Sequence, residues 1–556
     1  MTQQSLGQQA SSSKPRRGAL LVGAGILLSR LVGLARQRAL AHSFGTSIAA
    51  AAFAVALRIP NFLQNLFGEG VLSASFIPVY AALTGSKKQE EADRVAGAVF
   101  GLLALVVGLF TALGMLALPW LMALIAPGLV GESYELTMRL VQIAFPGTAL
   151  LVFSAWCLGV LNSHRRFFLS YAAPVVWNLT IILALLVADA DDVAQLAVIA
   201  TWATVVGSAL QFGVQLPATL RLLGQFRPSL GITNPHVRQV IRNFVPVMFA
   251  RGVVQVSAYI DLAYASLLSA RALAALSQAQ GISLLPVSLF GMAVSAAELP
   301  AMSQVSGTAS EVATAMRARI DAGLLRIAVP VVPSAIAFLM LGDVVAAAIF
   351  ETGAFRAADT RYVWYLLMGS AVGLLASTSG RLYASAFYAL QDPRTPFRLA
   401  VLRVALTAAL AFYSVRYLPA QLGLPRDLGG AGITASTGLV AWFEYLMLKR
   451  LLGQRIGRTG LGRGVLAKLW GSAIGAAMLA LGLKWALGWL FGVRDATAAE
   501  WGGSFLMPPA LHPVPAAILI LGVFGVAYFG LVILVDVPFA REMIRRRLPG
   551  RLRGKI

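Results

Sequence analysis

The chain has very few of the residues that bind metals or form disulfides. It contains 556 residues but one cysteine, Cys157, and its four histidines lie far apart, at His42, His164, His236 and His512. A single cysteine excludes a disulfide within the chain, and histidines this scattered do not form a metal-binding motif. The sequence therefore predicts neither a metal centre nor a bound cofactor.

Motifs of common enzymes are also missing. The sequence has no GxxxxGK[ST] phosphate-binding loop, no GxSxG nucleophile elbow and no HExxH zinc motif. The glycines at 23 and 25 lack the third glycine and the preceding strand of a dinucleotide-binding turn. A membrane enzyme would need carboxylates, a metal site or a nucleophile and base gathered at one membrane face, and the loops provide none. We expect the protein not to be an enzyme.

Charged residues make up only 12% of the chain, and basic residues outnumber acidic ones by 45 to 23, which gives a net charge of +22. Hydrophobic residues make up 58%, and the mean hydropathy is +0.76. Repeated runs of about 20 apolar residues match the thickness of a bilayer. Because the basic residues cluster in alternate loops, as orientation signals do, we interpret the chain as an all-α integral membrane protein with no nucleic-acid partner.

Hydropathy and turn signals predict fourteen transmembrane helices. The alternation of basic and non-basic loops places both termini in the cytoplasm and the chain in an inner or plasma membrane. Residues 1–17 are interpreted as a disordered cytoplasmic tail without a signal-peptide cleavage site, and 541–556 as a basic cytoplasmic tail. The predicted spans are residues 18–42, 47–84, 93–125, 134–161, 167–189, 193–223, 237–268, 271–303, 312–342, 359–390, 396–417, 428–453, 464–492 and 514–539.

An internal repeat indicates a two-lobed design. The triplet LFG at 66–68, followed by Pro78, recurs at 289–291, followed by Pro300, and the loop after the fourth span has a counterpart after the tenth. Repeats of this kind are common in transporters. We predict two pseudo-symmetric six-helix lobes and two additional C-terminal helices, in residues 18–223, 236–453 and 464–540 respectively.

Arginines inside the apolar segments carry most of the functional information. Arg30 and Arg36 lie in the first predicted span, Arg58 in the second and Arg251 in the seventh. An arginine at the bilayer centre costs about 2.5–3.5 kcal/mol even on the lenient insertion scale, so such residues face a bundle interior or an aqueous cavity. Guanidinium groups bind phosphate and pyrophosphate through paired hydrogen bonds, and this favours an anionic cargo.

Other polar residues in the predicted spans either accompany these arginines or have a structural role. In the second span, Asn61 and Glu69 lie on the same helical stripe as Arg58. Asp261 is either the partner of an arginine or a cation or proton site. We expect Lys484 to extend its amine to the membrane interface, and Glu298 to hydrogen-bond a neighbouring helix.

Several motifs resemble the signature of a known family. They are SRLVGLAR at 29–36, FG at 44–45, IPN at 59–61, LFGEG at 66–70, FIPV at 76–79, FETGAF at 350–355 and AFYALQDPRTP at 386–396. Together they look like the motifs of the MurJ (MviN) lipid II flippases, within the multidrug/oligosaccharidyl-lipid/polysaccharide exporter superfamily. The resemblance runs in order through the first twelve predicted spans.

The resemblance implies a flippase of the bacterial cytoplasmic membrane with two six-helix lobes around a cationic cavity that opens alternately to each side. Helices 13 and 14 would form a groove for the polyprenyl tail. The substrate would be lipid II, the undecaprenyl-pyrophosphate-linked precursor of peptidoglycan, moved to the periplasmic leaflet. Its other expected partners are membrane lipids and cell-wall synthesis proteins, and the chain is expected to be a monomer.

The resemblance also carries over individual residues. Arg30, Arg36, Arg58, Asn61 and Glu69 match the family pattern and are the expected substrate-binding residues. The chain departs from the pattern at residues 37 and 51, where relatives carry acids, and at residue 64 and near residue 281, where they carry basic side chains. We hypothesise that Arg251 and Arg38 compensate for missing cationic positions, and Asp261 matches an acid thought to couple transport to a cation.

Two other functions remain open at this point. A divergent paralogue could flip another polyprenyl-pyrophosphate glycan, which equally needs arginines. A non-transporting scaffold for cell-wall synthesis would also tolerate the departures from the family pattern. A cation-coupled drug exporter of the same superfamily would favour acidic and aromatic cavity residues over arginines, and the composition disfavours it.

Overall fold

A computed structural model describes residues 13–190, 192–490 and 512–537, with side chains described there except at 13–24, 26, 59–60, 69, 250–251, 253–254 and 257. Every regular element in these ranges is a helix, which confirms the all-α prediction. The chain divides into two compact units. Unit 1 contains Met1–Tyr259 and Thr352–Ala354, and unit 2 contains Ile260–Glu351 and Phe355–Ile556.

Eleven stretches of the described chain are long and apolar enough to cross a membrane, whereas the sequence predicted fourteen spans. The three others fold as helices but are not among the eleven: α2 (Ser13–Phe44), α10 (Pro235–Leu268) and α18 (Gly429–Ile456). Arginines lie along α2 and α10, and parts of both have side chains outside the described set. Glycines and the charged Glu444 and Lys449 lower the hydropathy of α18.

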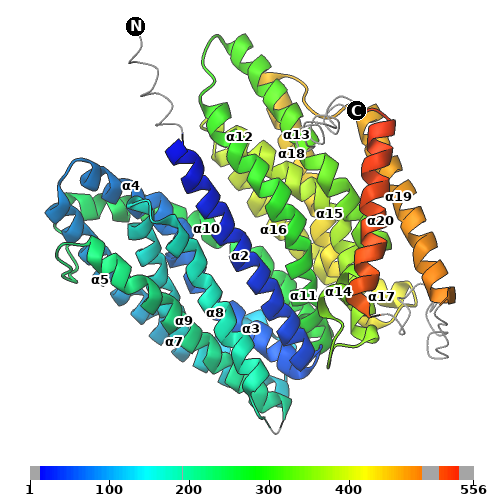
Figure 1. The fold of residues 1–556 in the computed structure, drawn as a ribbon, viewed down its shortest axis with the longest axis horizontal. Coiled ribbons are helices and arrows are strands. Elements are labelled where there is room, and N and C mark those ends of the chain that lie inside the picture. The colour runs from blue at the N-terminus through cyan, green and yellow to red at the C-terminus, as the bar shows by residue number, and fades with distance from the viewer. Residues whose placement is uncertain (1–12, 191, 491–511, 538–556) are drawn as a thin grey trace. The chain divides into compact units, whose positions relative to one another are not determined.

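Unit 1 contains α2 to α9 and the first part of α10 (Figure 1). Within it α7 packs against α3, α5 and α9, while α2 packs against α8 and α8 against α9. Side-chain caps begin two of these helices: Ser47 accepts from the amide of Ala50, and Asp192 from that of Gln195. The remaining bounds are α3 (Ile48–Phe67), α4 (Glu69–Gly85), α5 (Gln89–Leu116), α6 (Leu118–Ile125), α7 (Glu132–Ser163), α8 (Phe167–Val187) and α9 (Val193–Leu222).

The second predicted span is broken at Gly68, where α3 ends and α4 begins. Gly68 has φ −90° and ψ −154°, and its amide still donates to the carbonyl of Gln64. A Cβ at this position would lie 2.2 Å from that carbonyl oxygen, so the break requires glycine. Gly68 therefore interrupts the second predicted span.

The interior of unit 1 includes polar groups that are satisfied by neighbouring helices. The indole of Trp156 is fully buried and donates to the carbonyl of Ala96 at 3.1 Å. Ser154 donates to Gln215 at 3.0 Å and accepts from Gln211 at 2.9 Å, which joins α7 to α9. These bonds replace the solvent that a membrane interior cannot supply.

Unit 2 begins at Ile260, in the last third of α10, and contains the chain from there onward apart from Thr352–Ala354 (Figure 1). Its eighth predicted span is a single helical run in which a π-helical segment, η1, separates α11 from α12 just after Pro286. The bounds are α11 (Ala270–Pro286), η1 (Val287–Met292), α12 (Ala293–Ser303), α13 (Ala309–Met340), α14 (Gly342–Phe350), α15 (Ala357–Ala389), α16 (Arg394–Arg416), α17 (Leu418–Gln421), η2 (Arg426–Leu428), α19 (Arg463–Leu490) and α20 (Pro513–Leu534).

Two helices at the centre of unit 2, α15 and α18, approach one another at glycines. A Cβ on Gly373 would lie 2.2 Å from the Cα of Gly438, and one on Gly369 would lie 2.4 Å from the carbonyl oxygen of Ala431. Gly369 and Gly373 form a GxxxG pattern, which allows close helix packing in membranes.

Both pairs of repeated segments have related local geometry. LFG at 66–68 ends at the Gly68 break, and LFG at 289–291 lies within η1, so each interrupts regular α-helical hydrogen bonding. The helices before the two similar loops both end in a Schellman turn with a left-handed residue, Arg165 at φ 60° and Gln391 at φ 58°. Each pair of segments therefore shares a local backbone feature, and the two-lobed arrangement stays a prediction.

The last two helices pack side by side and against the rest of unit 2. Figure 1 shows α19 in orange and α20 in red, and α19 contacts α13 while α20 contacts α14. The hydroxyl of Tyr528 is buried and donates to the carbonyl of Val329 at 2.6 Å, which fixes α20 to α13.

Candidate functional site

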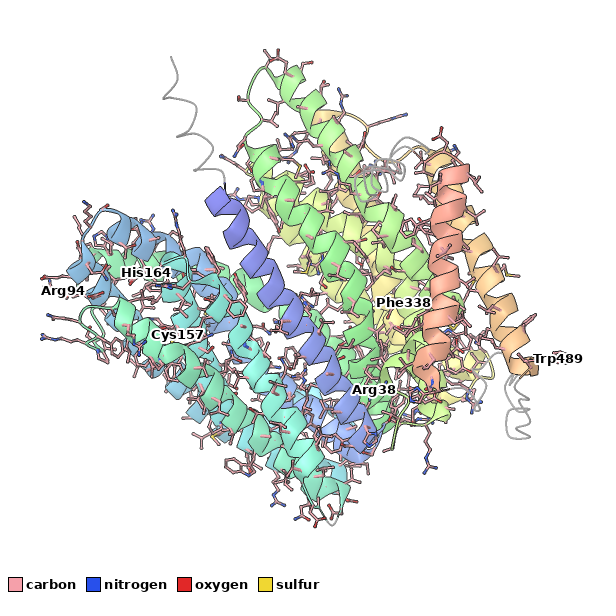
Figure 2. The ribbon with its side chains drawn as sticks, viewed as in Figure 1. Arg38, Arg94, Cys157, His164, Phe338 and Trp489 are labelled. Carbon is pink, nitrogen blue, oxygen red and sulfur yellow. The ribbon has the colours of Figure 1, made fainter. Side chains whose placement is uncertain are left out.

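Three of the arginines singled out in the sequence lie on α2. Arg30 is exposed and Arg36 is half-buried, while Arg38 lies near the C-terminal end of the helix (Figure 2). The guanidinium carbon of Arg36 is 4.6 Å from the centre of the Trp177 ring on α8. Its Nε is buried and has no hydrogen-bond partner. Buried donors are rarely left unpaired, so Arg36 is a group with unused binding capacity.

The orientation of Trp177 is fixed by α9. Its indole nitrogen donates to the carbonyl of Thr204 at 3.0 Å. A Cβ on Gly207 would lie 3.0 Å from the indole ring, so the glycine lets α9 come close. Sequence reasoning missed Trp177, because an isolated tryptophan in an apolar segment does not reveal which residue on another helix it faces.

The polar stripe of α3 lies near α10 within unit 1. The hydroxyl of Tyr259 donates to the backbone carbonyl of Arg58 at 2.8 Å, and its ring meets Phe62 edge to face at 5.7 Å. Arg58 and Asn61 are half-buried, as expected for residues that avoid lipid. The predicted site residues Glu69 and Arg251 lie outside the residues whose side chains are described.

Asp261 belongs to unit 2 and is only 8% exposed. One of its carboxylate oxygens accepts a long hydrogen bond, 3.4 Å, from the hydroxyl of Thr437 on α18. In the described part of the chain, no three His, Cys, Asp or Glu side chains are grouped so that they could hold a metal ion. A single buried carboxylate beside a hydroxyl can still hold a proton or contribute to a monovalent cation site.

Ion pairs inside unit 2 account for other intramembrane charges. Glu298 is buried on α12 and binds two arginines of α13, Arg326 at 2.6 Å and Arg319 at 3.5 Å. The prediction that Glu298 serves a neighbouring helix is confirmed. Lys484 is 1% exposed and pairs with Asp343, so the prediction that its amine reaches the interface is wrong. Asp343 lies 141 positions before Lys484, and nothing in the sequence indicates that the two side chains meet.

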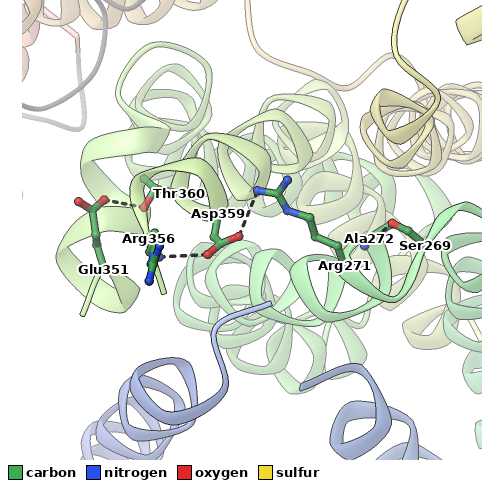
Figure 3. A network of polar contacts seen from close by, with 7 residues as sticks. All are labelled: Ser269, Arg271, Ala272, Glu351, Arg356, Asp359 and Thr360. Carbon is green, nitrogen blue, oxygen red and sulfur yellow. Dashed lines mark hydrogen bonds and ion pairs between the residues drawn. The ribbon is translucent and has the colours of Figure 1, made fainter. Parts of the chain in front are cut away.

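A polar network joins α11 to the segment around the start of α15 (Figure 3). Arg271 donates to one carboxylate oxygen of Asp359 at 3.1 Å, and the amide of Arg356 donates to the other at 3.0 Å. Next to it, Thr360 donates to Glu351 at 2.6 Å. Burial raises the pKa of Glu351 above its usual value, although the Thr360 hydrogen bond opposes this. The network fixes the loop that contains the FETGAF motif.

A shallow apolar groove of about 670 Å³ lies along one exposed face of α20, and all its lining residues belong to that helix. Ile518 and Val526, which line it, are 70% and 78% exposed. Exposed aliphatic surface of this kind is stable in contact with lipid chains rather than water. Its other lining residues include Pro515, Leu519 and Val523.

Comparisons with known proteins agree with this architecture. Residues 40–508 match the family model of the lipid II flippase MurJ. The lipid II flippase MurJ of Burkholderia cenocepacia is 30% identical over 545 residues, which is 96% of this chain and 99% of that protein. A relative from Rhizobium tropici, described as a probable lipid II flippase MurJ, is 32% identical over 441 residues, 77% of this chain and 79% of that one.

Solved structures share the fold. A lipid II flippase MurJ in an inward closed conformation matches with a TM-score of 0.71 and 20% identity, over 92% of this chain and 100% of that one. An inward-facing multidrug transporter of the MATE family matches with a TM-score of 0.60 and 17% identity, over 78% and 98% of the two chains. Because the family model covers most of the sequence, the chain belongs to the MurJ family of lipid II flippases.

Proposed function

We propose that this chain is a lipid II flippase, which moves the undecaprenyl-pyrophosphate-linked peptidoglycan precursor from the cytoplasmic to the periplasmic leaflet. The observation that carries the proposal is the family match over residues 40–508. The similarity to the flippase of Burkholderia cenocepacia, which extends over almost the whole of both chains, supports the same substrate. The role is transport across the bilayer rather than catalysis.

The pyrophosphate of the substrate requires charge neutralisation within the membrane. Arg36 supports this role, because Trp177 fixes its guanidinium while its Nε is left without a hydrogen-bond partner. Guanidinium donors can pair with phosphate oxygens in a low dielectric, where hydrogen bonds to charged groups are strong. We assign Arg36 the main contact, and Arg30, Arg58, Asn61, Glu69 and Arg251 complete the proposed substrate-binding set.

The polyprenyl tail needs an apolar path that remains open to lipid. The groove on α20 supports this assignment, since it is lined by aliphatic side chains and lies on an exposed face of the helix. The segment 464–540, which includes α19 and α20, would then hold the tail while the headgroup is transferred. The tail can stay in contact with the hydrocarbon core throughout transport.

The membrane topology and the transport mechanism are also proposed from membership of the MurJ family. The chain has fourteen transmembrane helices in two six-helix lobes, residues 18–223 and 236–453, and both termini lie in the cytoplasm. Transport proceeds by alternating access of the two lobes. Asp261, buried beside Thr437, is the proposed site for a coupling proton or cation.

Growth rescue tests the proposal directly. The chain is expressed in bacteria depleted of their own lipid II flippase, with membrane levels checked by immunoblotting. We expect the wild-type chain to restore growth and Arg36→Gln to fail. The matched control is Arg94→Gln, since Arg94 lies on the surface of unit 1 and pairs with exposed Glu90 (Figure 2). Failure of the wild-type chain at normal membrane levels would favour a scaffold role instead.

A further inference from the structure

A pocket of about 480 Å³ lies in unit 2 at the C-terminal end of α16, a size typical of small-molecule sites. The apolar side chains of Leu267, Phe412, Val415 and Leu424 line it. Two arginines, Arg416 and Arg426, also line it, together with Pro419 and Ala420. The pocket thus combines an apolar interior with two positive charges.

The arginines remain available for a ligand. Both are exposed, and neither forms an ion pair within the part of the chain that the structure describes. One guanidinium nitrogen of Arg426 donates to the carbonyl of Leu267 at 3.4 Å, which holds the side chain at the pocket. The nearest acid in sequence, Asp427, accepts a hydrogen bond from Ser269 at 3.4 Å.

The pocket lies at the end of a membrane-spanning helix, at the level expected for lipid headgroups. α16 has 23 residues and is a candidate membrane span that ends at Arg416. At 1.5 Å per residue it is about 34 Å long, which slightly exceeds the hydrocarbon core of about 30 Å. The exposed rings of Tyr413 and Tyr417 lie at the same end, as aromatic residues do at membrane interfaces.

Orientation signals do not explain these two arginines. Basic residues that orient a membrane protein collect in its cytoplasmic loops. Under the orientation proposed above, this end of α16 faces the periplasm, where the loops contain few basic residues. The helix C-terminus attracts a cation, but that effect requires no apolar pocket beside it.

We propose that this pocket binds an anionic diacyl phospholipid, with an acyl chain against Leu267, Phe412 and Leu424 and the phosphate against Arg416 and Arg426. Charge complementarity selects an anionic headgroup, and the apolar side chains that line the pocket favour a lipid over a soluble phosphate. The site is separate from the tail groove on α20, whose lining residues it does not share.

Lipid binding to the purified full-length chain tests the proposal. Native mass spectrometry measures the affinity of phosphatidylglycerol and phosphatidylcholine for the wild type and for the double variant Arg416→Gln/Arg426→Gln. Each basic residue near an anionic membrane surface is worth about a fivefold preference, so we expect the double variant to lose roughly 25-fold in phosphatidylglycerol affinity. Binding of phosphatidylcholine should stay unchanged.

Two further variants make the test specific. Arg394→Gln/Arg398→Gln removes two exposed arginines from the opposite end of α16 and should keep wild-type phosphatidylglycerol affinity. Ala420→Phe fills the pocket, which Ala420 lines, and should weaken phosphatidylglycerol binding with both arginines present. Equal losses in the two double variants, or full binding in Ala420→Phe, would overturn the proposal. So would competition by glycerol phosphate as strong as that by the lipid.

Discussion

The ammonium group of Lys484 on α19 donates to a carboxylate oxygen of Asp343 on α14 at 2.5 Å, and both side chains are 1% exposed. The ring of Trp364 lies 5.8 Å from the same ammonium group. The pair therefore connects the penultimate helix to the helices of unit 2 that precede it. With the Tyr528 hydrogen bond to Val329, it gives the α19–α20 pair two buried polar attachments.

We predict that Lys484→Met destabilises unit 2 strongly. It leaves the Asp343 carboxylate buried without a counter-charge, and the other oxygen of that carboxylate already lacks a partner. Breaking a buried pair from one side costs about 3–5 kcal/mol. The apparent melting temperature of purified protein in detergent should fall clearly.

The double variant Lys484→Met/Asp343→Leu is the control for this prediction. Replacing both partners with apolar residues removes the unpaired charge, so most of the stability should return. Arg455→Gln, which breaks a half-exposed pair with Asp392, should have a much smaller effect. A double variant as unstable as Lys484→Met would show that the pair itself is not the cause.

A second prediction concerns the support of Arg36 by Trp177. A cation–π contact is worth about 1–2 kcal/mol when shielded from water, so Trp177→Leu should slow lipid II transport in proteoliposomes by about 5- to 30-fold. Trp177→Phe keeps an aromatic face and should retain most activity, although it loses the hydrogen bond to Thr204. Trp202→Leu, at an exposed tryptophan of α9, is the matched control. Equal rates for the two leucine variants would contradict the role of Trp177.

Features that depend only on the local sequence of one segment were predicted correctly. The helical class, for example, follows from the apolar runs. The function follows from motifs whose order and spacing are specific to a family. Hydropathy alone does not decide the number of spans. Glycines, Glu444 and Lys449 keep α18 out of the eleven stretches that are long and apolar enough to cross a membrane.

Pairings between distant helices were not predictable. The spacing of Arg36 on its own helix gives no information about Trp177. The position of Lys484 near a helix end predicts that its amine reaches water, because the sequence does not show that Asp343 lies beside it. Such contacts depend on which helix faces pack together. Glu298 was assigned correctly to a neighbouring helix, but the sequence did not identify its two arginine partners.

The close approach of α15 and α18 leads to a third prediction. Gly373→Ala would place a methyl group 2.2 Å from the Cα of Gly438, so the helices must separate. Overpacking of this kind costs about 1–3 kcal/mol, which should lower the melting temperature in detergent. Gly482→Ala on α19 is the control, because a Cβ there has nothing within 4 Å and alanine favours the helix. Unchanged stability of Gly373→Ala would mean that the two helices do not meet at these glycines.

The last prediction concerns pH and the loop between α15 and α16. Asp392 accepts hydrogen bonds from the hydroxyl of Thr395 at 2.7 Å and from Arg455 at 2.6 Å. These bonds, that of Thr395 foremost, lower the pKa of Asp392 to about 2. The unfolded value is about 3.9. Because the folded pKa is the lower one, the stabilisation is complete above about pH 4 and is lost as the pH falls toward 2.

Asp392→Asn should therefore be less stable than the wild type at pH 7, and the difference in melting temperature should shrink as the pH is lowered from 4 to 2. Protonation of the wild-type carboxyl makes the two proteins alike at the low end of this range. Glu132→Gln, at an exposed carboxylate in the first turn of α7, controls for the general effect of removing one negative charge. A difference that stays constant across the range would show that Asp392 does not titrate with a lowered pKa, and that the hydrogen bonds to Thr395 and Arg455 do not depend on its charge.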